Sequence, residues 1–331
     1  MDYRSKVIFA EADKAERKYR PVIVILFFLA IYLIFSTVAS ILMTPLMMHD
    51  VMRTDDYRLL VDRFAVTGKF DTEAMMDLLT VLSPTVFLVQ LFSFALVYPV
   101  CFFFMRKLEK RSYASAGFVK GKIIKNYLTG YLIGAAVMIM CGAFCLITSN
   151  GSFTPAVKPN VLYIVLCFLG YIIQGAGEEI MCRGVLFVSL RNSMKNRARV
   201  PIAVLLSSLA FAILHSFNPG MTFLSFFNLF LSGVFFALML IRFDNIWVCC
   251  AAHSAWNFFQ GNVLGAQVSG MDTRAYSILN FKGTGSGLIN GGNFGFEGGL
   301  ACTIVSVILI LLLWFLPSFN KPKTGGNTDE V

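Results

Sequence analysis

Long apolar runs alternate with short polar stretches along most of the chain. A helix needs about 20 residues to cross the ~30 Å hydrocarbon core of a bilayer. Runs that approach or reach this length cover residues 22–43, 85–105, 127–148, 161–174, 200–214, 223–241, 246–260 and 300–316, and the fourth continues into residues 178–179. The pattern therefore predicts an all-α fold, a polytopic membrane helix bundle with about eight transmembrane helices.

Lys and Arg occur at every second connection between the predicted helices. Such residues favour the cytoplasmic side of membrane proteins. They lie in the arm before the first helix, in the connection after the second, at residues 191–199, at Arg242 and in the C-terminal tail. The connection between the first two helices instead carries seven acidic residues. An even number of crossings satisfies this alternation, so we expect both termini in the cytoplasm.

Composition supports a membrane protein, because only 14% of the 331 residues are charged, whereas about 25% is usual in soluble domains. The net charge of +9 is explained by the basic connections, which also favour contact with anionic lipid head groups. The sequence has no motif of a nucleic-acid-binding fold, so nucleic acid is not an expected partner. Its eight cysteines lie in or beside apolar runs without the paired spacing of a metal site, which predicts buried free thiols.

We divide the chain into a basic arm at residues 1–20, a membrane bundle at 21–316 and a polar cytoplasmic tail at 317–331. The first apolar run is too long for the hydrophobic region of a signal peptide, so we expect it to remain as an anchor. The glycine-rich stretch 261–299 is expected outside the bilayer, packed against the bundle. Within it, Glu297 either faces the outer end of a cavity or is satisfied by glycine backbone amides.

Three ionisable residues, Glu178, Glu179 and Arg183, follow the fourth apolar run. If the helix ended before them, they would lie at the interface, but the apolar stretch 185–190 beyond them favours a place within the membrane. Each charge there costs about 2.5–3.5 kcal/mol on insertion scales, so a function is the favoured explanation. Glu179 and Arg183 are four residues apart on one helix face and can pair, whereas Glu178 is left available.

Two further polar sets lie at a similar depth. Phe211 and His215 are four residues apart at the end of the fifth helix, and so are His253 and Asn257 on the seventh. Intramembrane His and Asn often serve only as hydrogen-bonding contacts between helices. Two histidines at the depth of a glutamate pair nevertheless favour a shared site that includes Glu178.

The sequences EEIMCR from Glu178, FAILH from Phe211 and HSAWN from His253 resemble three signatures, EExxxR, FxxxH and HxxxN. Their order and spacing are similar to those of the CAAX protease and bacteriocin-processing (CPBP) family of intramembrane endopeptidases, which includes the type II CAAX prenyl proteases. The sequence SAGFVKGK from Ser115 also resembles a family element, so the resemblance covers about residues 115–262. It implies a membrane-embedded peptidase bundle.

The resemblance also implies a role for each motif residue. Amide hydrolysis needs a general base for water and stabilisation of an oxyanion. The base and its partner would be Glu178 and His215, and the oxyanion would be bound by His253 and Asn257. The residues that support the shape of this site would be Glu179, Arg183 and Phe211.

Metal dependence separates two versions of this chemistry. Glu178, His215 and His253 could ligate zinc, with water in the open position. The sequence lacks the HExxH helix in which a base lies between two zinc ligands, and the better-studied members of the family resemble metal-independent glutamate enzymes. We therefore expect no metal, with zinc as the alternative.

The expected substrate is a membrane-associated or lipidated peptide or protein, and the sequence does not indicate whether it is prenylated. The compact chain is similar to bacterial members of the family, which predicts a bacterial plasma membrane. Two non-catalytic functions stay open, a bacteriocin-immunity or other membrane binding protein and a small transporter. The transporter is disfavoured because two related halves are not evident, and the oligomeric state is not predicted.

Overall fold

The computed structural model describes residues 6–72, 74–75, 78, 83–148, 150–273 and 276–315, and within them the protein is mostly helical. The α-helices are α1 (Val7–Asp13), α2 (Pro21–Val51), α3 (Asp55–Thr67), α5 (Pro84–Ser93), α6 (Val97–Phe103), α7 (Ile123–Ile147), α8 (Val161–Glu179), α9 (Val188–Ser193), α10 (Arg199–Leu214), α11 (Phe223–Phe243), α12 (Ile246–Phe258) and α13 (Leu300–Phe315). Short 3₁₀ or π segments are η1 (Phe94–Leu96), η2 (Phe104–Leu108), η3 (Tyr113–Ala116), η4 (Ile180–Phe187), η5 (Phe259–Val263), η7 (Gly292–Phe294) and η8 (Phe296–Gly298). The predicted tail at 317–331 lies outside the described residues.

Each apolar run forms a helix over most of its length. The second run is built from α5, η1, α6 and η2, and the fourth from α8, η4 and α9. Five of the described helical stretches are long and apolar enough to cross a bilayer, namely 21–51, 84–108, 123–147, 161–193 and 223–243, whereas 199–214 and 300–315 are shorter. A membrane helix bundle is thus confirmed, while the count of eight crossings and the side on which the termini lie stay predictions.

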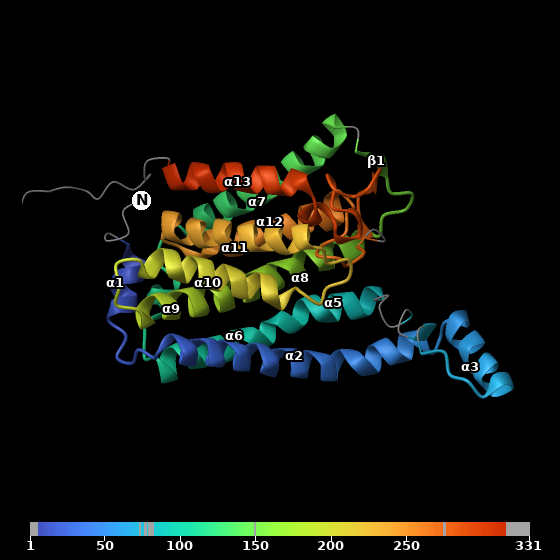
Figure 1. Cartoon of the computed structure of the whole chain (residues 1–331), viewed down its shortest axis with the longest axis horizontal. Helices are drawn as coiled ribbons and strands as arrows, with labels where there is room; N and C mark the ends of the chain where they lie inside the picture. The colour runs from blue at the N-terminus through green and yellow to red at the C-terminus, as the bar shows by residue number, and fades with distance from the viewer. Residues whose placement is uncertain are drawn as a thin grey trace, which may run out of the picture.

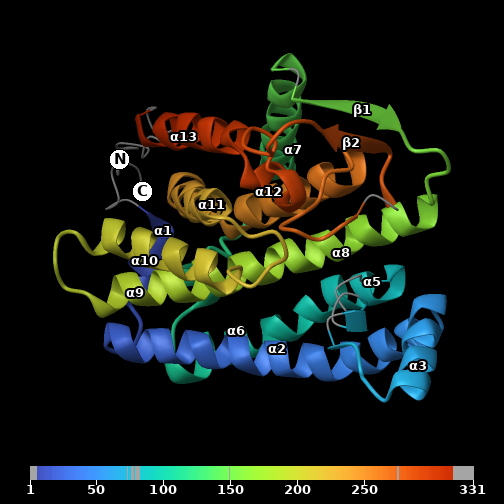
Figure 2. The same ribbon diagram turned by 45° about the vertical axis from the view of Figure 1, so that its right-hand side comes forward.

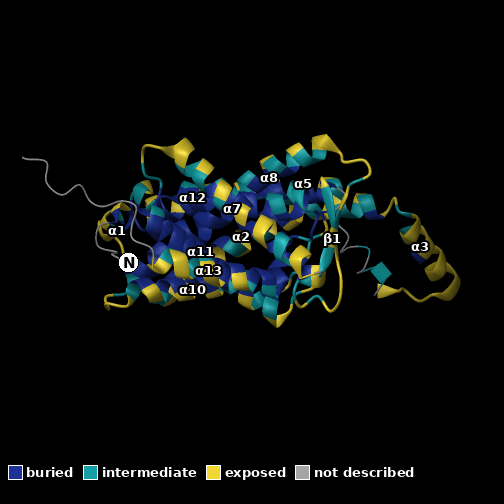
Figure 3. Cartoon of the chain, turned by 90° about the horizontal axis from the view of Figure 1, so that it is seen from above, coloured by how far each residue is buried: buried dark blue, intermediate teal, exposed yellow. Residues whose placement is uncertain are grey.

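Helix α12 occupies the middle of the bundle. It packs along both α7 and α8, and α8 in turn contacts α5. Figures 1 and 2 place α2 and α6 on one side of α8 and α11 and α13 on the other. Buried residues concentrate in α11 and α12, while α3 is largely exposed (Figure 3). The two helices that carry the Glu pair and the HxxxN motif therefore pack directly against each other.

Local sequence explains where the central helices begin and end. The side chain of Asn160 accepts a hydrogen bond from Tyr163 N and caps α8, and that of Asn245 caps α12 through Trp247 N. Helix α8 continues past its charged residues: together with η4 and α9 it forms one helical stretch of 33 residues that ends at Ser193. The ionisable residues therefore lie in the interior of a helix, as the apolar stretch behind them predicted.

Helices α1 and α3 and strands β1 and β2 were not predicted from the sequence. Helix α1 lies within the basic arm, and α3 lies within the acidic connection. Strand β1 (Gly151–Pro155) pairs antiparallel with β2 (Leu279–Gly283) (Figure 2). The ring centroids of Phe153 and Phe281 lie 5.1 Å apart across the pair. This two-stranded sheet fastens the glycine-rich stretch to the connection that follows α7.

Candidate active site

Glu179 and Arg183 form an ion pair inside the bundle. Arg183 Nη1 donates to Glu179 Oε1 over 2.9 Å, and the two side chains are 1% and 0% exposed, respectively. The same glutamate oxygen accepts a hydrogen bond from His253 Nδ1 over 2.8 Å. The pair that the four-residue spacing predicted is therefore present, and it also orients a histidine of α12.

Aromatic rings enclose the guanidinium of Arg183. Its Cζ lies 4.6 Å from the ring centroid of Phe211 and 5.3 Å from that of Phe236, and Nη2 donates to the Gly233 carbonyl over 3.3 Å. A guanidinium stacked on ring faces is stabilised by their electrons, more so away from water. The ring of Phe211 also lies 4.7 Å from that of His215. Phe211 thus connects the ion pair to the second histidine.

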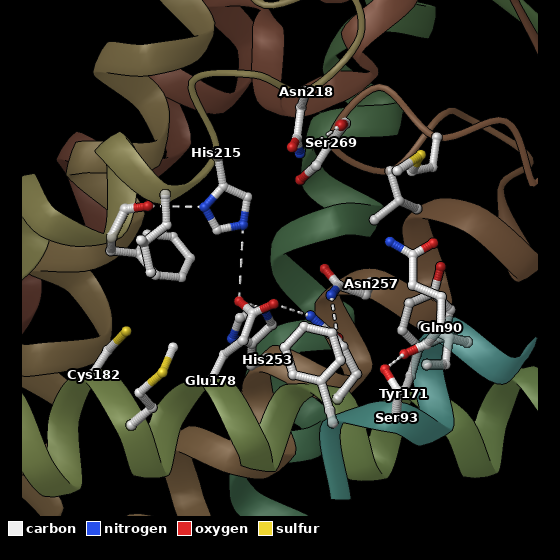
Figure 4. Close-up of a pocket in the computed structure, with 18 of the residues that line it drawn as sticks. Gln90, Ser93, Tyr171, Glu178, Cys182, His215, Asn218, His253, Asn257 and Ser269 are labelled. Carbon is white, nitrogen blue, oxygen red and sulfur yellow. Dashed lines mark hydrogen bonds and ion pairs between the residues drawn. The ribbon is translucent and has the colours of Figure 1, made fainter. Parts of the chain in front are cut away.

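Glu178 is buried like Glu179 but has different neighbours. Its Oε2 has no hydrogen-bond partner among the described residues and lies 3.7 Å from His253 Nε2 and 3.9 Å from His215 Nε2. Both separations are too long for a direct hydrogen bond. Figure 4 shows His215 and Glu178 facing each other across this gap. A gap of this size between polar atoms suits a bridging water molecule.

Hydrogen bonds of the two histidines determine which nitrogen faces Glu178. His215 Nδ1 lies 2.8 Å from the carbonyl oxygen of Phe211, which can only accept, so Nδ1 carries a proton. His253 Nδ1 faces the Glu179 carboxylate in the same way. In neutral rings, each Nε2 then presents a lone pair. Two lone pairs and one carboxylate oxygen converge, and this arrangement attracts a hydrogen-bond donor such as water.

Gln174 joins the site, although the sequence analysis did not single it out. Its Nε2 donates to Glu178 Oε1, and its Oε1 accepts from Asn257 Nδ2 over 2.9 Å. One oxygen of Glu178 is thereby held while the other stays free. The available signal was that Gln174 precedes Glu178 by four residues, which places both on one face of α8. Asn257 therefore contacts Glu178 through Gln174.

A cavity of about 320 Å³ opens beside Glu178. Helices α2, α5, α8, α10, α11 and α12 contribute to its wall, together with Val268, Ser269, Met271 and Glu297. Within the described part of the chain, the lining includes no Lys or Arg side chain. Five residues predicted from the motifs border this one cavity: Glu178, Phe211, His215, His253 and Asn257.

Residues 160–259 match the family model described as type II CAAX prenyl endopeptidase Rce1-like. This segment is similar to the Rce1-like endopeptidases. The matched residues include all three motifs and cover about a third of the chain, so the match confirms the resemblance that the motifs indicated. No curated protein and no solved structure matches the chain.

Beyond the residues matched to the Rce1-like family, Glu297 borders the same cavity. Its carboxylate accepts hydrogen bonds from Trp256 Nε1 (3.0 Å) and from the backbone N and Oγ of Ser269 (2.8 Å each). Trp256 and Ser269, rather than glycine amides, therefore satisfy Glu297, and Glu297 lines the cavity; its place at the outer end stays a prediction. By binding both Trp256 of α12 and Ser269, Glu297 fastens the glycine-rich stretch beside the site.

The matched residues bring together the donor set considered for zinc, Glu178, His215 and His253. Two ligands of a tetrahedral zinc ion with bonds of about 2.0–2.1 Å would be about 3.4 Å apart. Glu178 Oε2 lies 3.7 and 3.9 Å from the two Nε2 atoms, and among the described residues no group of three such side chains meets the geometry of a metal site. The donor types suit zinc, whereas the spacing suits a water molecule better.

Proposed function

We propose that the protein is an intramembrane endopeptidase that hydrolyses a peptide bond with water activated by Glu178. One observation carries the proposal: the Glu178 Oε2 atom is buried without a protein partner among the described residues, and it faces Nε2 atoms of His215 and His253 inside a cavity. The match to the Rce1-like family supports protease activity in general. The geometry supports the particular assignment of the base.

In the proposed reaction, Glu178 removes a proton from a water molecule that also contacts His215 Nε2. The resulting hydroxide attacks the carbonyl carbon of the substrate and forms a tetrahedral intermediate whose oxyanion needs hydrogen-bond donors. His253, oriented by Glu179, donates to it from Nε2 when its ring is protonated, and Asn257 contributes its amide. Glu178 then passes its proton to the leaving nitrogen, the C–N bond breaks, and a carboxylic acid and an amine are released.

The proposed substrate is a membrane-associated or lipidated peptide or protein. The helices that border the cavity are apolar on their outer faces, as shown by exposed large residues on α2 such as Leu26, Leu33 and Ile41. A cavity inside such a bundle accepts a substrate that is itself in or at the bilayer. We place the protein in a bacterial plasma membrane, as part of the same proposal.

No metal takes part in the proposed steps. If zinc were held, Glu178, His215 and His253 would be its ligands, and the ion would lower the pKa of its bound water. The two versions differ in their response to a chelator, because a bound ion can be removed whereas a carboxylate cannot.

The test compares wild-type protein with Glu178→Gln and His215→Ala in proteoliposomes that contain a panel of apolar transmembrane peptides. Mass spectrometry detects cleavage, and the amount of each variant in the membrane is measured alongside. Glu178→Gln, which lacks the general base, should lower the rate of cleavage by about 10²–10⁴-fold. His215→Ala should also cleave more slowly, and a chelator should have no effect on the wild type. Equal cleavage by both variants and the wild type would rule out the catalytic assignment and leave a binding or immunity protein.

A further inference from the structure

One face of α8 presents three polar side chains toward the cavity. Tyr171, Gln174 and Glu178 are separated by three and four residues, so they lie along one face of the helix. At about 1.5 Å per residue, Tyr171 is about 10 Å from Glu178 along the axis. Gln174 and Glu178 are hydrogen-bonded to each other. Tyr171 is the member of this row whose polar group the catalytic site does not use.

The hydroxyl of Tyr171 is buried without a partner. Tyr171 is 2% exposed, it borders the cavity, and its Oη has no hydrogen-bond partner among the residues described. Its ring packs at 6.3 Å against that of Phe87, which in turn stacks on Tyr276. The aromatic contacts hold the ring in place. An unpaired polar group costs free energy in an apolar interior, so a fixed one beside a cavity indicates where a ligand binds.

Gln90 on α5 provides a complementary group. It borders the same cavity, and its buried Oε1 also has no partner within the described ranges. In Figure 4, Gln90 and Tyr171 lie on the opposite side of the view from His215. A phenol can donate a hydrogen bond and an amide oxygen can accept one. Together they match the C=O and N–H groups of a peptide backbone.

The rest of the wall favours an uncharged, apolar ligand. Large apolar side chains line the space, among them Phe87, Leu91, Phe94, Leu214 and Phe236. The lining described above includes no Lys or Arg, and its two histidines lie beside Glu178. A carboxylate placed beside Tyr171 and Gln90 would therefore have no counter-ion, and its burial would be costly. A neutral segment with apolar side chains meets both conditions.

We propose that Tyr171 and Gln90 form a subsite for the backbone of an extended, uncharged, apolar peptide segment, about three residues from the scissile bond. The distance follows from the geometry, because about 10 Å along α8 corresponds to three residues of an extended chain at about 3.3 Å each. The inference rests on the proposed function, since it takes the bond near Glu178 as the one that is cut. It adds the class of substrate: a neutral internal segment whose backbone is held on one side of that bond.

The test uses binding as well as cleavage. A dye-labelled Leu/Ala-rich transmembrane peptide is titrated into nanodiscs that contain Glu178→Gln alone or combined with Tyr171→Phe, Gln90→Leu or Tyr131→Phe. Tyr131 is the matched control, because it packs on Phe168 and Phe259 of other elements and does not line the cavity. Tyr171→Phe and Gln90→Leu should each weaken binding about three- to tenfold, the effect of one hydrogen bond, whereas Tyr131→Phe should not.

An ester scan locates the contact. Each backbone N–H of the peptide is replaced in turn by an ester oxygen, which removes the donor for Gln90. At one position, the ester should weaken binding of the peptide to Glu178→Gln but should have no further effect once Gln90→Leu is also present. That position should lie about three residues from the bond that the wild type cuts. If Tyr171→Phe and Gln90→Leu bind as tightly as the Tyr131→Phe control, the subsite is refuted, whatever the cleavage result. If the wild type cuts no peptide, the proposed function fails, and the binding titrations still decide on the subsite.

Discussion

At the scale of single residues, two adjacent carboxylates with the same chemistry have different neighbours. Glu179 Oε1 accepts hydrogen bonds from both Arg183 and His253 and so carries the structural ion pair. Glu178 keeps one oxygen without a protein partner in the described structure. A buried ion pair whose partner is removed leaves an uncompensated charge and is costly to break. Glu179 is therefore suited to hold the site, and Glu178 to react.

Gln174 should act as a positioning residue for Glu178. We expect Gln174→Met, which keeps the volume but removes both hydrogen bonds, to lower kcat by about 10- to 100-fold while KM changes little, because misplacing a reacting group is costly. Steady-state kinetics on a peptide that the wild type cuts provides the measurement. The control is Asn257→Ala. The part of its effect that passes through Gln174 should disappear in the Gln174→Met background, while the part due to its direct role at the oxyanion should remain. Additive effects of the two changes would show that Gln174 does not connect Asn257 to Glu178.

The sequence predicted most of this site because its residues occur at helical spacing. Charged residues inside an apolar stretch are conspicuous, and the four-residue interval between Glu179 and Arg183 indicated their pair. Gln174 was not predicted, because an uncharged amide at the end of an apolar run has no distinctive signal. Tyr171 was missed for a similar reason, since a tyrosine in a membrane helix is ordinary until its hydroxyl is found without a partner.

At the scale of elements, the close approach of α7 and α12 positions His253. A Cβ added at Gly134 would lie 2.0 Å from the carbonyl oxygen of Ala252, and one at Gly130 would lie 2.1 Å from that of Val248. Such distances are far below van der Waals contact, so only glycine allows these backbones to pack. Gly130 and Gly134 form a GxxxG spacing, which is typical of closely packed membrane helices. Ala252 directly precedes His253, so this contact fixes the height of the histidine in the bundle.

Gly134→Ala should therefore destabilise the protein and impair the site together. We expect a loss of about 1–3 kcal/mol, typical of overpacking, and a lower rate of cleavage because α12 is displaced. The unfolding of purified protein in detergent measures the first effect, and the peptide assay measures the second. Gly142→Ala on the same helix is the control: its Cβ would meet only side chains, the nearest being Phe153 Cζ at 3.2 Å. Equal effects of the two substitutions would argue against the backbone contact as the cause.

The sequence predicted elements correctly where apolar runs were long, and it missed strands that pair with segments far away in the sequence. Apolar runs of helical length identified the bundle helices without reference to any partner. Strands β1 and β2 are only five residues each and pair across more than a hundred residues of sequence, so no local pattern indicated them. The amphipathic α3 was overlooked because the acidic residues around it resembled a loop, although Thr54 caps its start.

At the scale of the whole molecule, contacts between distant segments gather the basic connections at one end. The carboxylate of Asp244 accepts hydrogen bonds from the first backbone N–H groups of α1, and Asp13 at the end of α1 pairs with Arg191 and Arg199. Partial burial raises the pKa of Asp13, but the hydrogen bond and charge of Arg191 and the charge of Arg199 outweigh it, so the net pKa lies below its ordinary value. Asp13 is thus charged at neutral pH. Figure 1 shows α1 at one end of the bundle and α3 and β1 at the other.

This arrangement predicts the sidedness of the protein in the membrane. The end that holds α1 and the basic connections should face the cytoplasm, and the end that holds α3 should face outward. All eight native cysteines are free and buried, as the sequence predicted, so the wild type provides a low background for thiol labelling. In cells that express Lys69→Cys or Lys195→Cys, both at exposed positions, a membrane-impermeant maleimide should label Lys69→Cys directly and Lys195→Cys only after permeabilisation. If only Lys195→Cys were labelled in intact cells, the topology would be inverted and the basic connections would lie outside. Labelling of both positions in intact cells would contradict the separation of the two ends by a bilayer.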